Sequence, residues 1–190
     1  ELGKDWYRKL FLPASRLVMA QSWAIHNIPL WHTSFAIGCG LFFGDAKLVA
    51  QSWMGDLGGR NQILKGFTPD GIWYENSTGY PYYSLQAAST LCLFARMMGM
   101  EDAEVFGRVI NGYVAFLKLR FRNDTMPAFN DGWRGAGEMG LRGRLETYMY
   151  AARLFEGIPG ADQLAAAIAD MDTDGTLGEF LYGKVQTEQS

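Results

Sequence analysis

The sequence predicts an all-α fold, because apolar residues recur at every third or fourth position through much of its 190 residues. Two segments show this helical spacing most clearly. In the first segment the recurring residues are Leu85, Ala88, Cys92, Ala95 and Met98. In the second they are Phe106, Val109, Ile110, Tyr113, Phe116 and Leu117. Two acids, Glu101 and Asp102, precede the second segment. Negative charge interacts favourably with the positive end of a helix dipole, so a helix is predicted to begin there.

Other stretches of helical character lie between glycines and prolines that punctuate the chain. They are residues 5–12, 15–25, 31–43, 46–64, 145–156 and 161–170. Pro13 is expected to interrupt the first helix, which then restarts. The glycines within 46–64 are expected to divide that stretch in two. Residues 31–43 are almost all apolar, which predicts a buried inner helix.

Length and composition indicate one domain without a nucleic-acid or membrane role. With 190 residues and 48% hydrophobic residues, the chain can bury one sizeable core. A net charge of −3 argues against a nucleic-acid groove, which needs a basic stripe. No run approaches the roughly 20 apolar residues of a membrane span. No phosphate-binding loop, dinucleotide motif or zinc spacing occurs, so we expect no cofactor and no metal.

Two stretches carry the residues suited to chemistry. The first is His26-Asn27-Ile28-Pro29-Leu30-Trp31-His32, which contains the only two histidines of the chain. The second, DGIWYENSTGYPYY at residues 70–83, opens with turn chemistry and passes into a helix near Tyr80. Reactive side chains often lie at such loop-to-helix junctions.

Together these stretches, HNIPLWHTSFAIGCGLFFGD and FTPDGIWYENSTGYPYYSL, resemble the heparinase II/III-like polysaccharide lyases, which include oligo-alginate lyases. The resemblance covers most of the chain. It implies part of an incomplete α/α toroid, in which helical hairpins surround a cleft. It further implies that residues 1–175 form the later part of the toroid of a larger enzyme. Residues 176–190 would be a linker or the start of a missing C-terminal β-sandwich.

The reaction implied by the resemblance is β-elimination at a glycosidic bond beside a uronic acid. The substrate would be an acidic polysaccharide or oligosaccharide, either alginate or a glycosaminoglycan. Family members pair a histidine or asparagine of the first motif with a tyrosine of the second, and these match His26 and Tyr80. We predict Tyr80 as general acid, and as base where geometry allows. His26 is predicted as base or carboxylate neutraliser, and Asn27 as hydrogen-bond donor to the substrate carboxylate.

A second group of residues is predicted to bind substrate. It comprises Trp31, His32, Trp73, Glu75, Asp131 and Trp133. Aromatic faces stack on sugar rings, although large core residues are an equally good interpretation of each ring. Glu75 is expected to act as a hydrogen-bond partner rather than as a catalyst. Asp131-Gly132-Trp133 lies in a glycine-rich stretch, residues 122–142, that is predicted to be a functional loop.

Two other functions remain open from the sequence. An α/α-toroid glycoside hydrolase would use two carboxylates, for which Glu75 and Asp131 are the candidates. A non-catalytic carbohydrate-binding or structural helical fragment would bind without turnover. Cys39 and Cys92 are interpreted as buried free thiols and do not settle the compartment. A bacterial periplasm is favoured, and the cytoplasm stays open.

Overall fold

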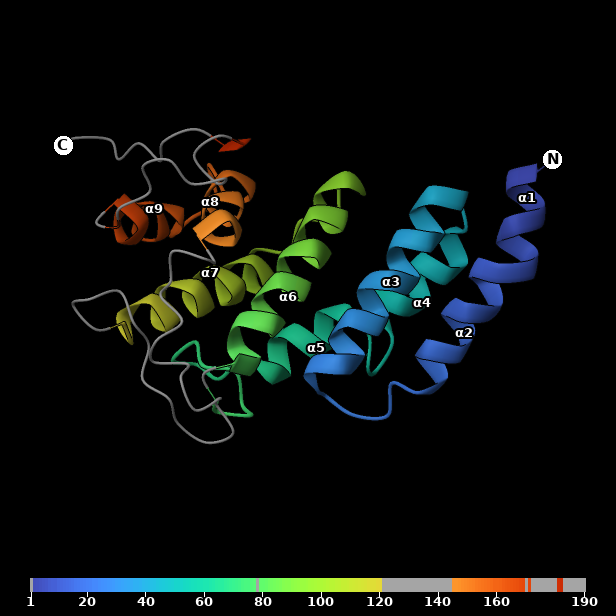
Figure 1. The fold of residues 1–190 in the computed structure, drawn as a ribbon, viewed down its shortest axis with the longest axis horizontal. Coiled ribbons are helices and arrows are strands. Elements are labelled where there is room, and N and C mark those ends of the chain that lie inside the picture. Colours follow the sequence, from blue (N-terminus) through green and yellow to red (C-terminus); the bar gives the residue numbers. More distant parts are fainter. Residues whose placement is uncertain (1, 78, 121–144, 170, 172–180, 183–190) are drawn as a thin grey trace.

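The computed structural model of the chain describes residues 2–77, 79–120, 145–169, 171 and 181–182. Within these ranges the regular elements are helices (Figure 1). Their bounds are α1 Leu2–Trp6, the π-helical turn η1 Tyr7–Phe11, α2 Leu12–Ala20, α3 Asn27–Phe43, α4 Ala46–Met54, α5 Gly59–Gly66, α6 Gly79–Met97, α7 Ala103–Lys118, α8 Leu145–Leu154 and α9 Ala161–Ala169. The only strand-like contact in the described part is an isolated bridge between Phe67 and Trp73. The prediction of an all-α fold is confirmed.

The helices form two layers joined by helical hairpins. In one layer α3 packs against α6, and α6 against α8; in the other, α5 packs against α7, and α7 against α9. Contacts of α3 with α5, of α6 with α7 and of α8 with α9 connect the two layers, and α3 also packs against α4. In Figure 1, α3 and α6 both begin at the lower edge and run upward, so their N-termini lie at the same end of the molecule.

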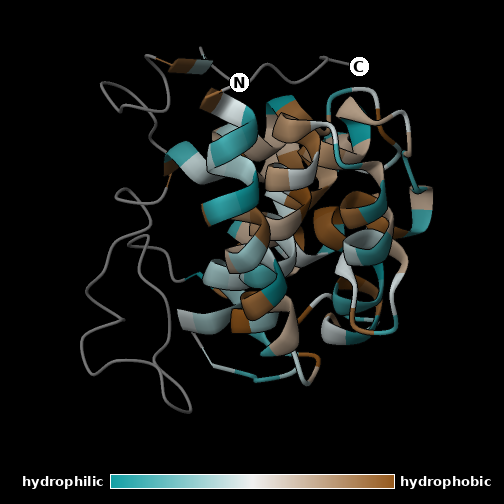
Figure 2. Cartoon of the chain, turned by 90° about the vertical axis from the view of Figure 1, so that its right-hand side faces the viewer, coloured by the Kyte–Doolittle hydropathy of each residue, from teal (hydrophilic) through white to brown (hydrophobic). Residues whose placement is uncertain are grey.

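The core lies between these layers. Figure 2 shows apolar residues gathered where the helices face one another and hydrophilic residues mostly on outward surfaces. The largest fully buried side chains come from α4, α7, α8 and the segment after α5, and include Trp53, Tyr113, Tyr148 and Phe67. Cys39 and Cys92 are buried and unpaired, as predicted. No helix within the described residues is long and apolar enough to cross a membrane.

Most predicted helix limits agree with the structure. Helix α3 begins a few residues earlier than the predicted 31–43. The predicted break within 46–64 falls between α4 and α5. Helix α7 begins after Asp102, whose carboxylate accepts the backbone N–H groups of Glu104 and Val105.

The prediction at Pro13 is wrong. Helical structure continues through this residue, which lies in the first turn of α2 directly after the π-helical turn η1. In the first turn of a helix the backbone N–H has no acceptor within the helix, so a proline loses no hydrogen bond there. Its fixed φ also suits the helix. Helix α2 also ends at Ala20 rather than near residue 25, and an irregular segment then leads to α3.

Candidate active site at the N-termini of α3 and α6

The segment between α5 and α6 is folded back on itself and positions Glu75. The backbone N–H of Tyr74 donates to the carbonyl of Gly66 at 2.9 Å, and Thr68 and Ile72 exchange backbone and side-chain hydrogen bonds. Gly71 has a φ of 87°, in the left-handed region that a turn glycine tolerates. The predicted turn at this place is therefore confirmed.

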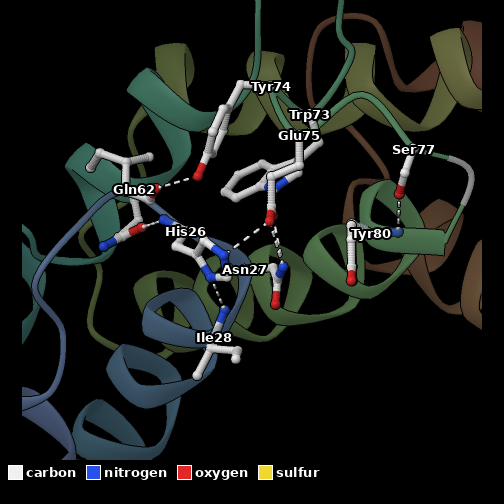
Figure 3. Close-up of polar contacts among 10 residues, drawn as sticks. His26, Asn27, Ile28, Gln62, Trp73, Tyr74, Glu75, Ser77 and Tyr80 are labelled. Carbon is white, nitrogen blue, oxygen red and sulfur yellow. Dashed lines mark hydrogen bonds and ion pairs between the residues drawn. The ribbon is translucent and has the colours of Figure 1, made fainter. Parts of the chain in front are cut away.

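The Glu75 carboxylate is the centre of a polar cluster (Figure 3). The Nδ2 group of Asn27 donates to both carboxylate oxygens, at 3.0 and 2.7 Å. The indole N–H of Trp73 donates to Oε2 at 2.5 Å. The Nε2 atom of His26 lies 3.0 Å from Oε1. The Glu75 side chain is 14% exposed, so these donors replace most of the water that a carboxylate requires.

His26 is fixed by the start of α3. Its extended backbone makes it the N-cap residue, and its Nδ1 atom accepts the backbone N–H of Ile28 at 3.3 Å. Its own backbone N–H donates to Oε1 of Gln62 at 3.1 Å. Gln62 is fully buried and anchors the preceding segment by donating to the carbonyls of Ala24 and Leu57. Both nitrogens of the imidazole therefore have partners.

Tyr80 lies at the start of the neighbouring helix. Its backbone N–H donates to the hydroxyl of the buried Ser77 at 3.3 Å, in the manner of a helix cap. Tyr80 is 36% exposed, and Figure 3 shows its side chain at the N-terminal end of α6. Because α3 and α6 pack together and begin at the same end, the fold brings the two predicted motifs to one place.

Two exposed aromatic residues border this cluster and are absent from the sequence-based prediction. Trp23 is 75% exposed, and its ring centroid lies 6.3 Å from that of His26. The Tyr74 hydroxyl donates to the carbonyl of Ile25 at 2.7 Å. Burial and, second, the negative charge of Glu75 raise the pKa of Tyr74. The closeness of Trp23 to His26 in the chain was the one available signal.

The structure contradicts the sugar-platform role for Trp73. This residue is fully buried, with its ring centroid 5.0 Å from that of Phe67 and 5.5 Å from that of Tyr74. Gly66 is close enough that a Cβ there would meet the indole at 2.2 Å. A ring covered on its faces cannot stack on a sugar, so Trp73 serves through packing and its N–H group.

Trp31 and His32 lie apart from the polar cluster. Trp31 contacts Tyr83, with ring centroids 5.3 Å apart, and lines an apolar groove with Phe35, Phe42 and Phe94. His32 lies toward α2, where its Nδ1 atom is 3.2 Å from the hydroxyl of Ser22. Burial lowers the pKa of His32. Their predicted substrate contacts therefore remain predictions.

The two remaining candidates, Asp131 and Trp133, lie outside the described residues, as does the whole predicted loop 122–142. Residues 176–190 lie outside them too, apart from Leu181 and Tyr182. Among the described residues, no group of three or more histidine, cysteine, aspartate or glutamate side chains could hold a metal ion.

These features define an all-α protein whose helix N-termini gather a carboxylate, an imidazole and an amide next to a tyrosine. The family model described as heparinase II/III N-terminus matches residues 24–155. This match covers more than half of the chain and contains His26, Asn27, Glu75 and Tyr80, so the chain belongs to the heparinase II/III family. Membership implies a polysaccharide substrate. Neither curated proteins nor solved structures gave a match.

Proposed function

We propose that the chain is the helical part of a polysaccharide lyase that cleaves a uronate-containing polysaccharide by β-elimination and leaves an unsaturated uronate. The proposal is supported chiefly by one observation. His26 and Asn27 contact Glu75 at the start of α3, and α3 packs against α6, which carries Tyr80 near its own start. All four residues fall within the range that matches the family. The substrate class is alginate or a glycosaminoglycan.

The proposed reaction needs three protein functions. A base removes the C5 proton, the C5–H electron pair forms the C4=C5 double bond, and the C4–O bond breaks as the leaving oxygen takes a proton. The uronate carboxylate must also be neutralised, because the intermediate adds negative charge beside it. Tyr80 is the proposed acid, and the base where geometry allows, because a tyrosine hydroxyl can donate a proton to a leaving oxygen. His26 is proposed as base or neutraliser.

Asn27 has a conditional place in this scheme. The residue is 4% exposed, and its Nδ2 group donates to both carboxylate oxygens of Glu75. To donate to a substrate carboxylate, as predicted from the sequence, it must exchange Glu75 for the substrate. Without that exchange, its contribution is to hold Glu75 in place.

The domain assignment is part of the same proposal. Residues 1–175 would belong to the α/α toroid, and residues 176–190 would be a linker or the start of a β-sandwich. The matched family model describes an N-terminal part, which agrees with an enzyme that has further domains. The activity is therefore proposed for the full-length protein, and the isolated chain is expected to be much slower.

The test is product analysis with the full-length protein on alginate, heparan sulfate and hyaluronan. A lyase produces chain ends that absorb in the ultraviolet, because of the new C4=C5 double bond conjugated with the carboxylate. New reducing ends without that absorbance would indicate a hydrolase and contradict the proposal. Binding without either product would indicate a carbohydrate-binding protein.

A further inference from the structure

We propose that Glu75 is a positioning residue that keeps the proton of neutral His26 on Nε2, so that Nδ1 is the nitrogen that takes the substrate's proton. This inference rests on the proposed function for its catalytic consequence. The tautomer itself can be measured without any activity. With the Nε2 proton directed at Glu75 and the Nδ1 lone pair available, His26 would act as the base rather than as the neutraliser of the substrate carboxylate.

The hydrogen-bond partners of the two imidazole nitrogens are compatible with only one neutral tautomer of His26. An ionised carboxylate only accepts, so the Nε2 atom 3.0 Å from Oε1 must carry a hydrogen. On the other side of the ring, Nδ1 lies 3.3 Å from the backbone N–H of Ile28, which only donates. Nδ1 must therefore present its lone pair. The two contacts independently require the same form, Nε2–H.

The carboxylate is a fixed part of the protein rather than a group that substrate can displace. Its donors also include the amide of Asn27 and the indole of Trp73, and both residues are buried. Removing the carboxylate would leave these donors without this acceptor in a place that water does not reach, which is unfavourable. The residues on both sides of Glu75 are also held, since the backbone N–H groups of Tyr74 and Asn76 donate to the carbonyls of Gly66 and Trp73.

The contact at Nδ1 is the weaker one. Its distance of 3.3 Å is at the long end for a hydrogen bond, and this hydrogen bond is exposed to solvent. The Ile28 N–H is one of the first backbone donors of α3, which water or a substrate oxygen can satisfy. Nδ1 can therefore turn to a substrate proton at little cost. The imidazolium then formed keeps Nε2–H on Glu75, whose negative charge stabilises it.

The decisive variant is Glu75→Gln, which keeps the shape of the side chain. A glutamine can present its oxygen to Asn27 and Trp73 and its NH2 group to Nε2 of His26, which then must be unprotonated. We expect the nitrogen-15 shifts of the imidazole to report Nε2–H in the wild-type chain and a shift toward Nδ1–H in the variant. The chain has two histidines, so His32→Asn identifies the His26 signals.

In the full-length protein, Glu75→Gln should lower kcat about 100-fold or more, while KM changes about threefold or less, because a wrong tautomer affects the proton transfer and not binding. Glu101→Gln is the matched control. Glu101 is a partly exposed glutamate paired with Arg96 and should leave both the tautomer and kcat unchanged.

A wild-type His26 with its proton on Nδ1 would overturn the inference, and this measurement leaves Glu75 unchanged. Unchanged shifts or unchanged kcat in a folded Glu75→Gln protein would also overturn it. If the tautomer results hold but the full-length protein forms no unsaturated product, the positioning role stands and the proposed function fails.

Discussion

At the level of single residues, the hydrogen bonds to Glu75 determine which side chains of the candidate site can face a substrate. Among the described residues, the partners of the Glu75 carboxylate include Asn27 and His26 at the start of α3 and Trp73 after α5. As a result Asn27, which in isolation is a plausible ligand for substrate, is directed into the protein. The accessible groups at this place are His26 and Tyr80, with Trp23 and Tyr74 beside them.

Tyr80→Phe in the full-length protein is expected to remove most turnover and to leave substrate binding nearly unchanged. The hydroxyl would be needed only in the transition state, so its loss lowers kcat and not affinity. The ring keeps its packing, and the free energy of unfolding should fall by at most about 0.5–1.5 kcal/mol, the value of one hydrogen bond. Steady-state kinetics and chemical denaturation measure the two effects. Parental turnover in a folded variant would contradict the mechanism at its centre.

At the scale of elements, the junction between α5 and the segment after it connects the core to the candidate site. The last residue of α5, Gly66, faces the buried ring of Trp73, and the indole N–H of Trp73 donates to Glu75. A change at this glycine should therefore be transmitted to the polar cluster through one rigid side chain.

Gly66→Ala is expected to destabilise the protein by at least about 2 kcal/mol, because overpacking forces backbone or side-chain shifts. An added Cβ would lie 2.2 Å from the Trp73 ring, far inside van der Waals contact. Urea denaturation would measure the loss. The matched control is Gly107→Ala in α7, where nothing lies within 4 Å and the helix should gain about 0.5–1 kcal/mol. Equal stability of the two variants would contradict the close contact at Trp73.

The start of α4 predicts a pH dependence. The Asp45 carboxylate accepts the hydroxyl of Tyr7 and the backbone N–H of Leu48, and these hydrogen bonds hold the pKa of Asp45 below its usual value. Burial and the same carboxylate raise the pKa of Tyr7 to about 12. A lowered folded pKa contributes stability that is present above the unfolded pKa of about 3.9 and is lost as pH falls through the folded value.

We therefore expect Asp45→Asn to be less stable than wild type at pH 7, and the difference to shrink as pH falls below about 4. Thermal unfolding from pH 7 to pH 3 would measure it. Asp56→Asn, which changes an exposed aspartate, controls for the loss of one negative charge. A difference that grows as pH falls would contradict this account.

At the scale of the whole molecule, an apolar groove of about 810 Å³ crosses the surface formed by α1, α3 and α6. Its walls include Trp6, Trp31, Phe35, Phe42 and Phe94. Phe42 is 83% exposed. A helix with apolar residues on nearly all sides, such as α3, buries only the sides that neighbouring helices cover, so the remainder forms this surface.

Phe42→Gln is expected to change the free energy of unfolding by less than about 0.5 kcal/mol, because an exposed ring contributes little to stability. It should at the same time reduce binding of an environment-sensitive hydrophobic dye to the folded chain. The control is Phe116→Gln, which places a polar group at a buried position of α7 and should cost several kcal/mol. Strong destabilisation by Phe42→Gln would show that the ring is buried in solution.

Sequence analysis was sufficient to predict the helical class, most helix limits, the turn at Gly71 and the two motifs with His26 and Tyr80. These features depend on local propensity and on residue spacing, which a single chain displays directly. The uninterrupted helix at Pro13, the burial of Trp73 and the direction of the Asn27 amide were decided by tertiary structure. Each depends on partners from elsewhere in the chain, and residue type cannot reveal which donor will meet which acceptor. Glu75 shows this best, since an ordinary loop glutamate became the centre of the site only when α3 and the segment after α5 packed together.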